Sequence, residues 1–164
     1  MAASLTQKRL RELLSYNPRT GVFTWRVKPA RRVGAGTIAG TRNGRLRISI
    51  DDVEYNGARL AVLWMTGKLP ANVVDHINGD PNDNRWRNLR LATQSQNHGN
   101  SHMRRDNRSG LKGAFKQSRA NTYYSKIKVD GRIIYLGSFE TAAEAHIAYR
   151  KAARKYFGEF ARFS

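Results

Sequence analysis

Four polar side chains in the segment DHINGDPNDNRWRNLRLATQSQN, residues 75–97, have the types and spacing that phosphodiester hydrolysis requires. Asp75 and His76 end one apolar run, NVVDH, Asn88 precedes a second run, LRLAT, and Asn97 falls in the first turn of the helix expected next. If the two runs pair as strands, Asp75, His76 and Asn97 can meet at one pocket. A carboxylate and an amide oxygen suit Mg²⁺, which keeps several waters and needs one or two protein ligands.

Each of the four side chains has a predicted role. We predict that Asp75 and the amide oxygen of Asn97 bind one Mg²⁺ or Mn²⁺ ion per active site. A neutral His76 imidazole can act as the general base that takes a proton from the attacking water. Asn88 is expected to orient the imidazole or to brace the hairpin.

Other metal sites and other roles for the loop residues are possible in this segment. His98 competes with Asn97 for the metal, but neighbouring helix residues diverge by about 100°, and Asn97 is favoured. A calcium loop starting at Asp80 fails because Arg85 stands where glycine is required. Trp86 is expected to pack against the hairpin. Three loop residues are expected to be solvated: Asp80, Asp83 and Asn84. Three arginines are expected to meet phosphates or the loop's own carboxylates: Arg85, Arg87 and Arg90.

The elements that position these residues are expected to be short. The local pattern is strand, loop, strand and helix, with Thr93 as the cap of the helix. Upstream, the pattern predicts an amphipathic helix over 5–15, strands over 21–27 and 46–50, and an apolar helix over 58–65 that ends at Gly67. The N-terminal part is therefore predicted to be β-rich with one buried helix.

The charge of the chain indicates its partner. Lys and Arg number 30 against 12 Asp and Glu, so the net charge is +18. A membrane partner would call for a long basic amphipathic helix or an extended apolar run, and the sequence has neither. The absence of cysteine excludes disulfides and thiolate zinc sites. The polar, basic start is unlike a signal peptide, and we expect a cytoplasmic, intracellular protein that binds nucleic acid.

The second half is predicted to form a three-stranded antiparallel sheet packed on one C-terminal helix. Strand-like segments cover 111–117, 123–129 and 132–139, with Asp130-Gly131 as a hairpin turn between the last two. The helix is expected to begin after Thr141, with Glu144 completing a capping box, and to end at Gly158. The fold class is therefore α+β.

The segment from Asp75 to Asn97 resembles the HNH homing endonucleases, the ββα-metal nucleases, in the variant whose third motif residue is Asn. The matching residues are Asp75 with His76, Asn88 and Asn97, and the lead-in TGKLPANVVDHINGD resembles phage and intron-associated members. One departure is Ala58, where relatives commonly have His. The resemblance implies a divalent-metal-dependent endonuclease encoded by a phage or another mobile element.

The segment from Ser109 to the C-terminus resembles the DNA-binding domain of the plant ethylene-response-factor (Apetala-type) family, most specifically in YLGSFETAAEAHIAY. That family lays its sheet in the major groove. The resemblance implies DNA contacts by Lys112, Phe115, Gln117, Lys126, Lys128, Ile133 and Tyr135. Phe115 and Ile133 replace the Arg of the plant domains, so their GC-rich site is not expected here.

Together these observations predict a nuclease domain over 1–105, with its ββα motif at about 70–104, and a separable DNA reader over 108–164. The predicted activity is cleavage of double-stranded DNA at a preferred site. Four arginines are expected to contact DNA: Arg85, Arg87, Arg104 and Arg105. A monomer and a homodimer both stay open. The rival interpretation is a non-catalytic DNA-binding or regulatory protein that keeps an HNH-like fold.

Overall fold

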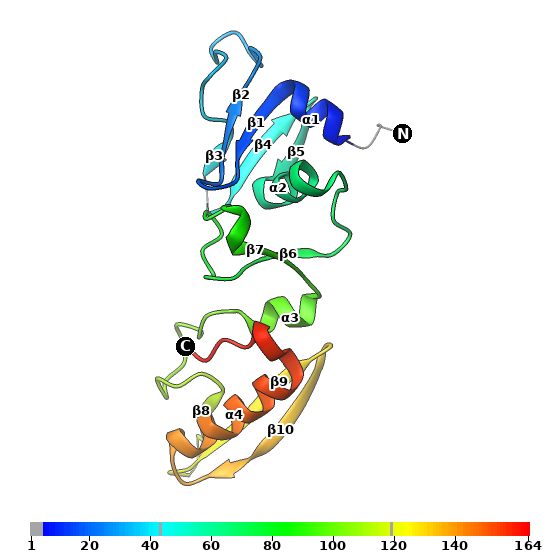
Figure 1. The fold of residues 1–164 in the computed structure, drawn as a ribbon. Coiled ribbons are helices and arrows are strands. Elements are labelled where there is room, and N and C mark those ends of the chain that lie inside the picture. The colour runs from blue at the N-terminus through cyan, green and yellow to red at the C-terminus, as the bar shows by residue number, and fades with distance from the viewer. Residues whose placement is uncertain (1–4, 43, 119) are drawn as a thin grey trace. The chain divides into compact units, whose positions relative to one another are not determined.

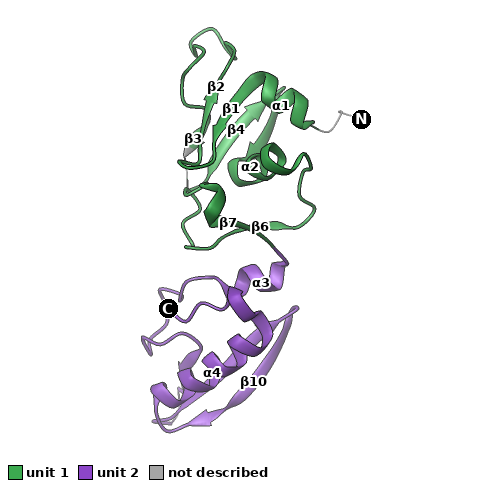
Figure 2. Cartoon of the chain, viewed as in Figure 1, with its two compact units in different colours: residues 1–91 green, residues 92–164 purple. Residues whose placement is uncertain are grey.

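Short strands and helices alternate along the chain in the computed structural model, which describes residues 5–42, 44–118 and 120–164 (Figure 1). They group into two compact units, residues 1–91 and residues 92–164 (Figure 2). The first unit holds α1 (Gln7–Leu13), β1 (Leu14–Asn17), β2 (Val22–Trp25), β3 (Thr41–Arg42), β4 (Leu46–Ile50), β5 (Val53–Asn56), α2 (Gly57–Thr66), β6 (Val73–His76), a 3-10 turn (Trp86–Asn88) and most of β7 (Leu89–Ala92).

The elements of the first unit begin and end at residues that the sequence marks. Thr6 caps α1 by accepting a hydrogen bond from Arg9 N at 3.1 Å. The Asn56 side chain caps α2, and Gly67, with φ of 79°, ends it in the left-handed conformation. The strands predicted over 21–27 and 46–50 and the helix predicted over 58–65 are confirmed. The helix predicted over 5–15 is confirmed only as Gln7–Leu13, because Leu14–Asn17 forms β1.

The core of the first unit lies between the two helices and the sheets β1-β2 and β3-β4-β5. Alternate residues of β4 are buried, so one face of this strand lines the core. Six large apolar side chains of the described residues are less than 2% exposed: Leu10, Leu14, Phe23, Ile48, Leu60 and Leu63. Ala58 belongs to the same core and is 2% exposed.

The second unit contains a three-stranded antiparallel sheet in the order β10-β9-β8, with α4 packed on it (Figure 1). The elements are α3 (Gln94–Gly99), β8 (Ala114–Lys116), β9 (Tyr123–Val129), β10 (Arg132–Phe139), α4 (Ala142–Phe157) and a 3-10 turn (Gly158–Phe160). Thr141 and Glu144 form the predicted capping box of α4. Asp130 and Gly131 have φ of 47° and 81°, as a type I′ hairpin turn requires.

The two faces of β9 differ as its alternation predicts. Ser125 and Ile127 are 0% and 3% exposed, and Ile127 belongs to the core that includes α4 residues. Tyr124, Lys126 and Lys128 alternate with them and therefore occupy the other face. Within the described residues, no helix has the length and apolar character needed to cross a membrane.

Helix α3, the last element of the predicted nuclease motif, is part of the second unit. A Cβ on Gly99 would lie 2.6 Å from the Phe157 ring, so only glycine lets α3 and α4 approach this closely. Arg162 N donates to Gly99 O at 3.2 Å. The compact units therefore divide at residue 91, inside the region predicted as the nuclease domain, because α3 packs on α4.

Removing the C-terminal helix should therefore unfold α3. In a chain that ends at Asn107, α3 loses Phe157, and a helix of 6 residues is marginal without tertiary contacts. Hydrogen exchange followed by mass spectrometry should show loss of protection in the peptide covering α3, while α2 stays protected as an internal control. Full protection of α3 in the truncated chain would contradict this packing argument.

Candidate functional site

Strands β6 and β7 pair, and the loop of residues 77–88 joins them. Ile77 N donates to Asn88 O at 2.9 Å, which closes the base of the loop. Asp75 and His76 are the last two residues of β6, so they lie where this strand enters the loop. The predicted strand, loop and strand are confirmed, and they place three of the four chemically interesting residues within one small substructure.

The Asp75 carboxylate forms an ion pair with Arg90. Its carboxylate is 3% exposed, and Oδ2 accepts a hydrogen bond from Arg90 Nε at 2.8 Å. The Arg90 side chain is itself 14% exposed, so the pair is largely removed from water. A buried carboxylate needs such a partner, and the contact fixes the direction of the carboxyl group. Arg90 thus pairs with the predicted metal ligand.

His76 is oriented by a neighbouring amide. Nε2 lies 3.1 Å from Oδ1 of Asn84. An amide oxygen accepts hydrogen bonds and donates none, so Nε2 carries the proton in this pair. The basic lone pair of a neutral imidazole then belongs to Nδ1. The contact therefore selects the tautomer that a general base acting through Nδ1 would need.

Asn84 is buried, which overturns the expectation that it is a solvated loop residue. It is 2% exposed, its backbone oxygen accepts from the Tyr16 hydroxyl at 2.7 Å, and its Nδ2 donates to Asn82 O at 3.4 Å. Burial raises the pKa of Tyr16 to about 12, with the Asp83 charge as a second cause, so the hydroxyl remains a donor at neutral pH. Sequence reasoning missed the burial of Asn84 because the Tyr16 hydroxyl that meets its backbone oxygen lies 68 residues away in the chain.

The β1–β2 turn supports the same loop. A Cβ on Gly21, whose φ is 73°, would lie 2.5 Å from Arg85 N, so the turn and the loop backbones are in close contact. Trp86 N donates to Pro18 O at 2.9 Å. Trp86 also packs against the core of the first unit, as predicted. The N-terminal hairpin is thus part of the framework that fixes Asn84.

Asn88 braces the loop from inside. It is 7% exposed, and its Oδ1 accepts from Asn78 N at 3.0 Å. Its Nδ2 donates to Asn78 Oδ1 at 3.0 Å and to Asp83 O at 2.8 Å. These bonds tie both ends of the loop together. They fit the bracing role that the sequence suggests for Asn88.

A second carboxylate of the loop is neutralised locally. Asp83 forms a bidentate ion pair with Arg85, and its side chain is 10% exposed, so the expectation of a solvated Asp83 is wrong. The hydrogen bond from Arg85 lowers the pKa of Asp83 to about 2. Arg85 therefore meets the loop's own carboxylate, one of its two predicted partners. Asp80 and Arg87 are exposed, as expected.

Asn97 lies in the second unit, in the first turn of α3. Its backbone N donates to Thr93 O at 3.0 Å, and Thr93 caps the helix in a capping box with Gln96. Asn97 is half-buried and the adjacent His98 is exposed. The helix and its cap are confirmed, whereas the prediction that Asn97 supplies the third side chain of the site stays a prediction.

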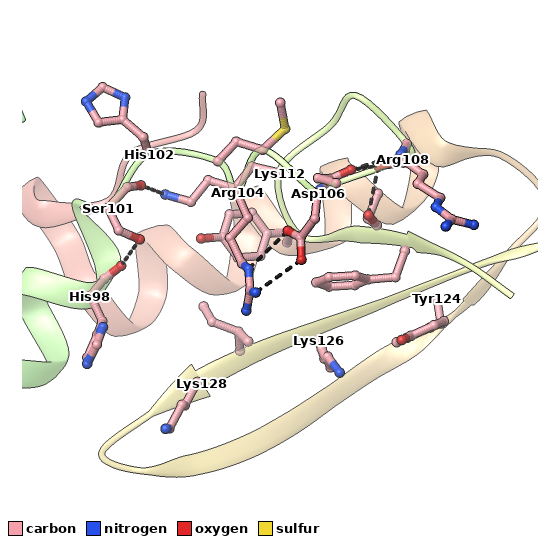
Figure 3. A pocket seen from close by; sticks show the side chains of 18 of the residues that line it. His98, Ser101, His102, Arg104, Asp106, Arg108, Lys112, Tyr124, Lys126 and Lys128 are labelled. Atoms are coloured by element: carbon pink, nitrogen blue, oxygen red, sulfur yellow. Dashed lines mark hydrogen bonds and ion pairs between the residues drawn. The ribbon is translucent and has the colours of Figure 1, made fainter.

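Lys112 departs from its predicted place among the DNA contacts. It is 8% exposed, and Nζ donates to the backbone oxygens of Gly99 (3.2 Å) and Arg162 (2.9 Å). It also donates to the backbone oxygen of Ser101, as Figure 3 shows. Burial lowers the pKa of Lys112 to about 8, with the Arg162 charge as a second cause. Its ammonium joins the end of α3 to the C-terminal segment and is not displayed on the sheet face.

The other predicted DNA contacts are accessible. Arg104 is exposed and forms an ion pair with Asp106 at 3.1 Å, and Arg105 is exposed. Six residues belong to the sheet or its immediate continuation and are at least partly exposed: Phe115, Gln117, Lys126, Lys128, Ile133 and Tyr135. Their role in DNA binding stays a prediction.

The donor set fits a hydrated hard cation. In the described ranges of the chain, no three His, Cys, Asp or Glu side chains come together as a metal cage. Mg²⁺ does not need such a cage, because it retains waters and takes substrate phosphate oxygens as ligands. Asp75, whose Oδ2 accepts from Arg90, is the one carboxylate of the predicted ligand pair, so waters and phosphate oxygens would complete the coordination.

Comparisons with known proteins agree with this geometry. Residues 58–98 match the HNH endonuclease family. An uncharacterized HNH endonuclease of Acanthamoeba polyphaga mimivirus is 35% identical over 100 residues, which cover 60% of this chain and 51% of the relative. Protein 3.8 of Escherichia phage T7 is 31% identical over 98 residues, which cover 59% of this chain and 80% of that protein. The chain thus spans about half the length of the mimivirus relative. No solved structure is significantly similar.

The buried ammonium should be necessary for stability. Lys112→Met keeps the length of the side chain but removes the ammonium that donates to three backbone oxygens. Gly99 O retains its bond from Arg162 N, whereas the oxygens of Ser101 and Arg162 lose the Lys112 donor, so the free energy of unfolding should fall by about 1–3 kcal/mol. Urea denaturation followed by circular dichroism measures the change. Lys116→Met, at an exposed position of β8, is the matched control and should change it by less than about 0.5 kcal/mol. Equal effects of the two substitutions would contradict the role of Lys112.

Proposed function

Because the chain belongs to the HNH endonuclease family, we propose that it is a homing-type endonuclease that hydrolyses phosphodiester bonds in double-stranded DNA at a preferred site. The observation that carries the proposal is the contact between His76 Nε2 and Asn84 Oδ1 at 3.1 Å, beside the buried Asp75. A histidine fixed in one tautomer next to an oriented carboxylate is suited to the attack of water on a phosphate.

Asp75 and Asn97 would hold one Mg²⁺ or Mn²⁺ ion, with Arg90 keeping the Asp75 carboxylate in position. When bound, a divalent ion supplies charge stabilisation for the scissile phosphate and its leaving oxygen. His76 takes the proton of the attacking water at Nδ1, while Asn84 retains the proton on Nε2. Asn88 keeps the loop that carries Asn84 closed.

The substrate follows from the family and the charge. A net charge of +18 favours a polyanion, and DNA provides phosphates for the exposed arginines of the loop and the linker. We assign DNA contacts to Arg85, Arg87, Arg104 and Arg105, of which Arg85 must share its guanidinium with Asp83. The sheet residues Phe115, Gln117, Lys126, Lys128, Ile133 and Tyr135 form a second DNA-binding surface.

A non-catalytic DNA-binding protein is the alternative, and Ala58 is the observation that favours it. The resemblance to HNH endonucleases leads us to expect His at this position, and here a methyl group packs in the core of the first unit. If that His takes part in catalysis in the relatives, this chain lacks the contribution. Incubation with plasmid DNA in Mg²⁺, against an EDTA control, separates the two functions, because only an endonuclease converts supercoiled plasmid to nicked or linear products.

His76→Ala should abolish cleavage and leave DNA affinity nearly unchanged. A general base contributes about 100- to 10,000-fold to rate, whereas binding depends on the arginines and lysines. Plasmid cleavage measures the rate and fluorescence anisotropy in EDTA measures affinity. His102→Ala, at an exposed position, is the matched control and should keep the wild-type rate. Equal losses of rate and affinity in His76→Ala would refute the assigned role.

Asn84→Asp should shift the pH dependence of cleavage. A carboxylate beside Nε2 favours the charged imidazolium, so the neutral base would predominate only at higher pH. The acidic limb of the pH–rate profile should move toward higher pH by about 1 unit or more. An opposite charge within hydrogen-bonding distance of the imidazole typically produces such a shift. Asn82→Asp, at an exposed position of the same loop, should leave the profile in place. An unshifted profile in a folded Asn84→Asp protein would show that Asn84 does not orient the base.

A further inference from the structure

The sheet face of the second unit that lies opposite the buried Ser125 and Ile127 carries a row of aromatic rings. Phe115, Tyr124 and Tyr135 come from β8, β9 and β10, one from each strand. The ring centroids of Phe115 and Tyr124 are 5.3 Å apart at an interplanar angle of 24°, and those of Tyr124 and Tyr135 are 6.4 Å apart at 22°. The row of near-parallel rings therefore crosses the whole sheet.

One end of this row is open to solvent. Tyr135 is 60% exposed, and Ile133, two residues before it on the same strand, is 65% exposed. Large apolar side chains gathered on one exposed face indicate a binding surface more than a structural need, because α4 already covers the opposite face. The flat exposed side of Tyr135 can extend the row by one more ring.

Three uncharged polar groups on this face, those of Gln117, Tyr135 and Ser138, are hydrogen-bonded to one another. Gln117 Nε2 donates to Ser138 Oγ at 3.2 Å, and the Tyr135 hydroxyl lies 2.6 Å from the same oxygen. A duplex presents base edges in its major groove and hides the flat faces of the bases within the stack, so its recognition depends on hydrogen-bonding groups. Unpaired bases present their flat faces, which stack on aromatic rings.

Two lysine side chains, Lys126 and Lys128, lie on the same face as the aromatic rings. Lys126 Nζ lies 5.1 Å from the ring centroid of Phe115 and 5.5 Å from that of Tyr124, so its ammonium is held against the row. Lys128 is exposed two residues further along β9, as Figure 3 shows. Residues 92–164 contain 14 Lys and Arg and 5 Asp and Glu, a difference of +9. A phosphate backbone that runs beside stacked bases complements this charge.

A cavity of about 550 Å³ opens beside the row (Figure 3). Phe115, Tyr124 and Lys126 contribute to its lining. The preceding linker contributes Arg108 and the ion pair of Arg104 with Asp106. Cavities of this size accommodate small ligands, and a nucleobase with its phosphate is within that range. The cavity and the aromatic row therefore form one continuous surface of rings and cations.

We propose that the row of Phe115, Tyr124 and Tyr135 binds unpaired DNA bases by stacking, with Lys126 and Lys128 on the adjoining phosphates. The choice of DNA rests on the proposed endonuclease function. The preferred substrate is then DNA in which an unpaired stretch adjoins the duplex that is cut, such as a gapped or branched duplex.

Binding by the full chain in EDTA tests the proposal apart from cleavage. The probes are a short single-stranded DNA of mixed sequence, the corresponding duplex, the same duplex with a central gap, and the RNA strand of the same sequence. Fluorescence anisotropy at matched salt should show tighter binding to the single strand and the gapped duplex than to the intact duplex. Tyr135→Leu should weaken binding to the unpaired probes by about 5- to 150-fold and affect the intact duplex far less.

Controls separate stacking from charge and from folding. Tyr156→Leu, at an exposed tyrosine of α4, is the matched control and should bind like the wild type. Lys128→Ala should reduce the slope of log affinity against log salt by about 0.7 for one lost contact with a single strand, whereas Tyr135→Leu should leave this slope unchanged. Circular dichroism confirms that each variant is folded.

Three results would overturn the proposal: wild-type preference for the intact duplex, equal losses on all DNA probes in Tyr135→Leu, or tighter binding to the RNA strand than to the DNA strand. Plasmid cleavage in Mg²⁺ is measured in parallel on the same preparations. A protein that binds unpaired DNA through Tyr135 but does not cleave would refute the proposed function and leave the stacking surface standing. A protein that cleaves but shows no preference for unpaired DNA would refute the stacking surface and leave the proposed function standing.

Discussion

One buried amide, that of Asn84, connects folding to the chemistry of the site. A fully buried amide has to be hydrogen-bonded, because an unsatisfied polar group costs about 1–3 kcal/mol. Here the side-chain oxygen meets His76, the backbone oxygen meets the Tyr16 hydroxyl, and the side-chain nitrogen meets Asn82 O. The conformation that satisfies Asn84 is also the one that fixes the imidazole. The orientation of His76 is therefore a by-product of packing the loop against the N-terminal hairpin.

The second unit also contains a buried polar group that must be hydrogen-bonded, and here it is the ammonium of Lys112. Lys112 joins three backbone oxygens from the end of α3, from Ser101 and from the C-terminal segment. Burying an ammonium is costly unless donors and acceptors match, and the three acceptors use its three N–H groups. Asn84 and Lys112 thus stabilise different parts of the nuclease motif, each with one partner that lies 50 or more residues away in the chain.

Local features of the fold could be predicted from the sequence, and features that depend on distant contacts could not. Thr141 with Glu144, Thr93 and the Asp130-Gly131 turn are read correctly because their hydrogen bonds span a few residues. Alternation along β9 also places Lys126 and Lys128 on one face. The burial of Asn84 depends on Tyr16, 68 residues away, and that of Lys112 depends partly on Arg162, 50 residues away. Composition and spacing carry no signal for such pairs.

The close contact between Gly99 and Phe157 limits where recombination could join this chain to a different C-terminal sheet and helix. Recombination that swaps the C-terminal sheet and helix at the linker near residue 105 would separate Gly99 from the ring that requires it to be glycine. A successful exchange would need its crossover before α3, so that the helix of the nuclease motif is inherited together with α4. Natural chimaeras of this chain should therefore carry their junctions near residue 91, where the two compact units meet in the sequence.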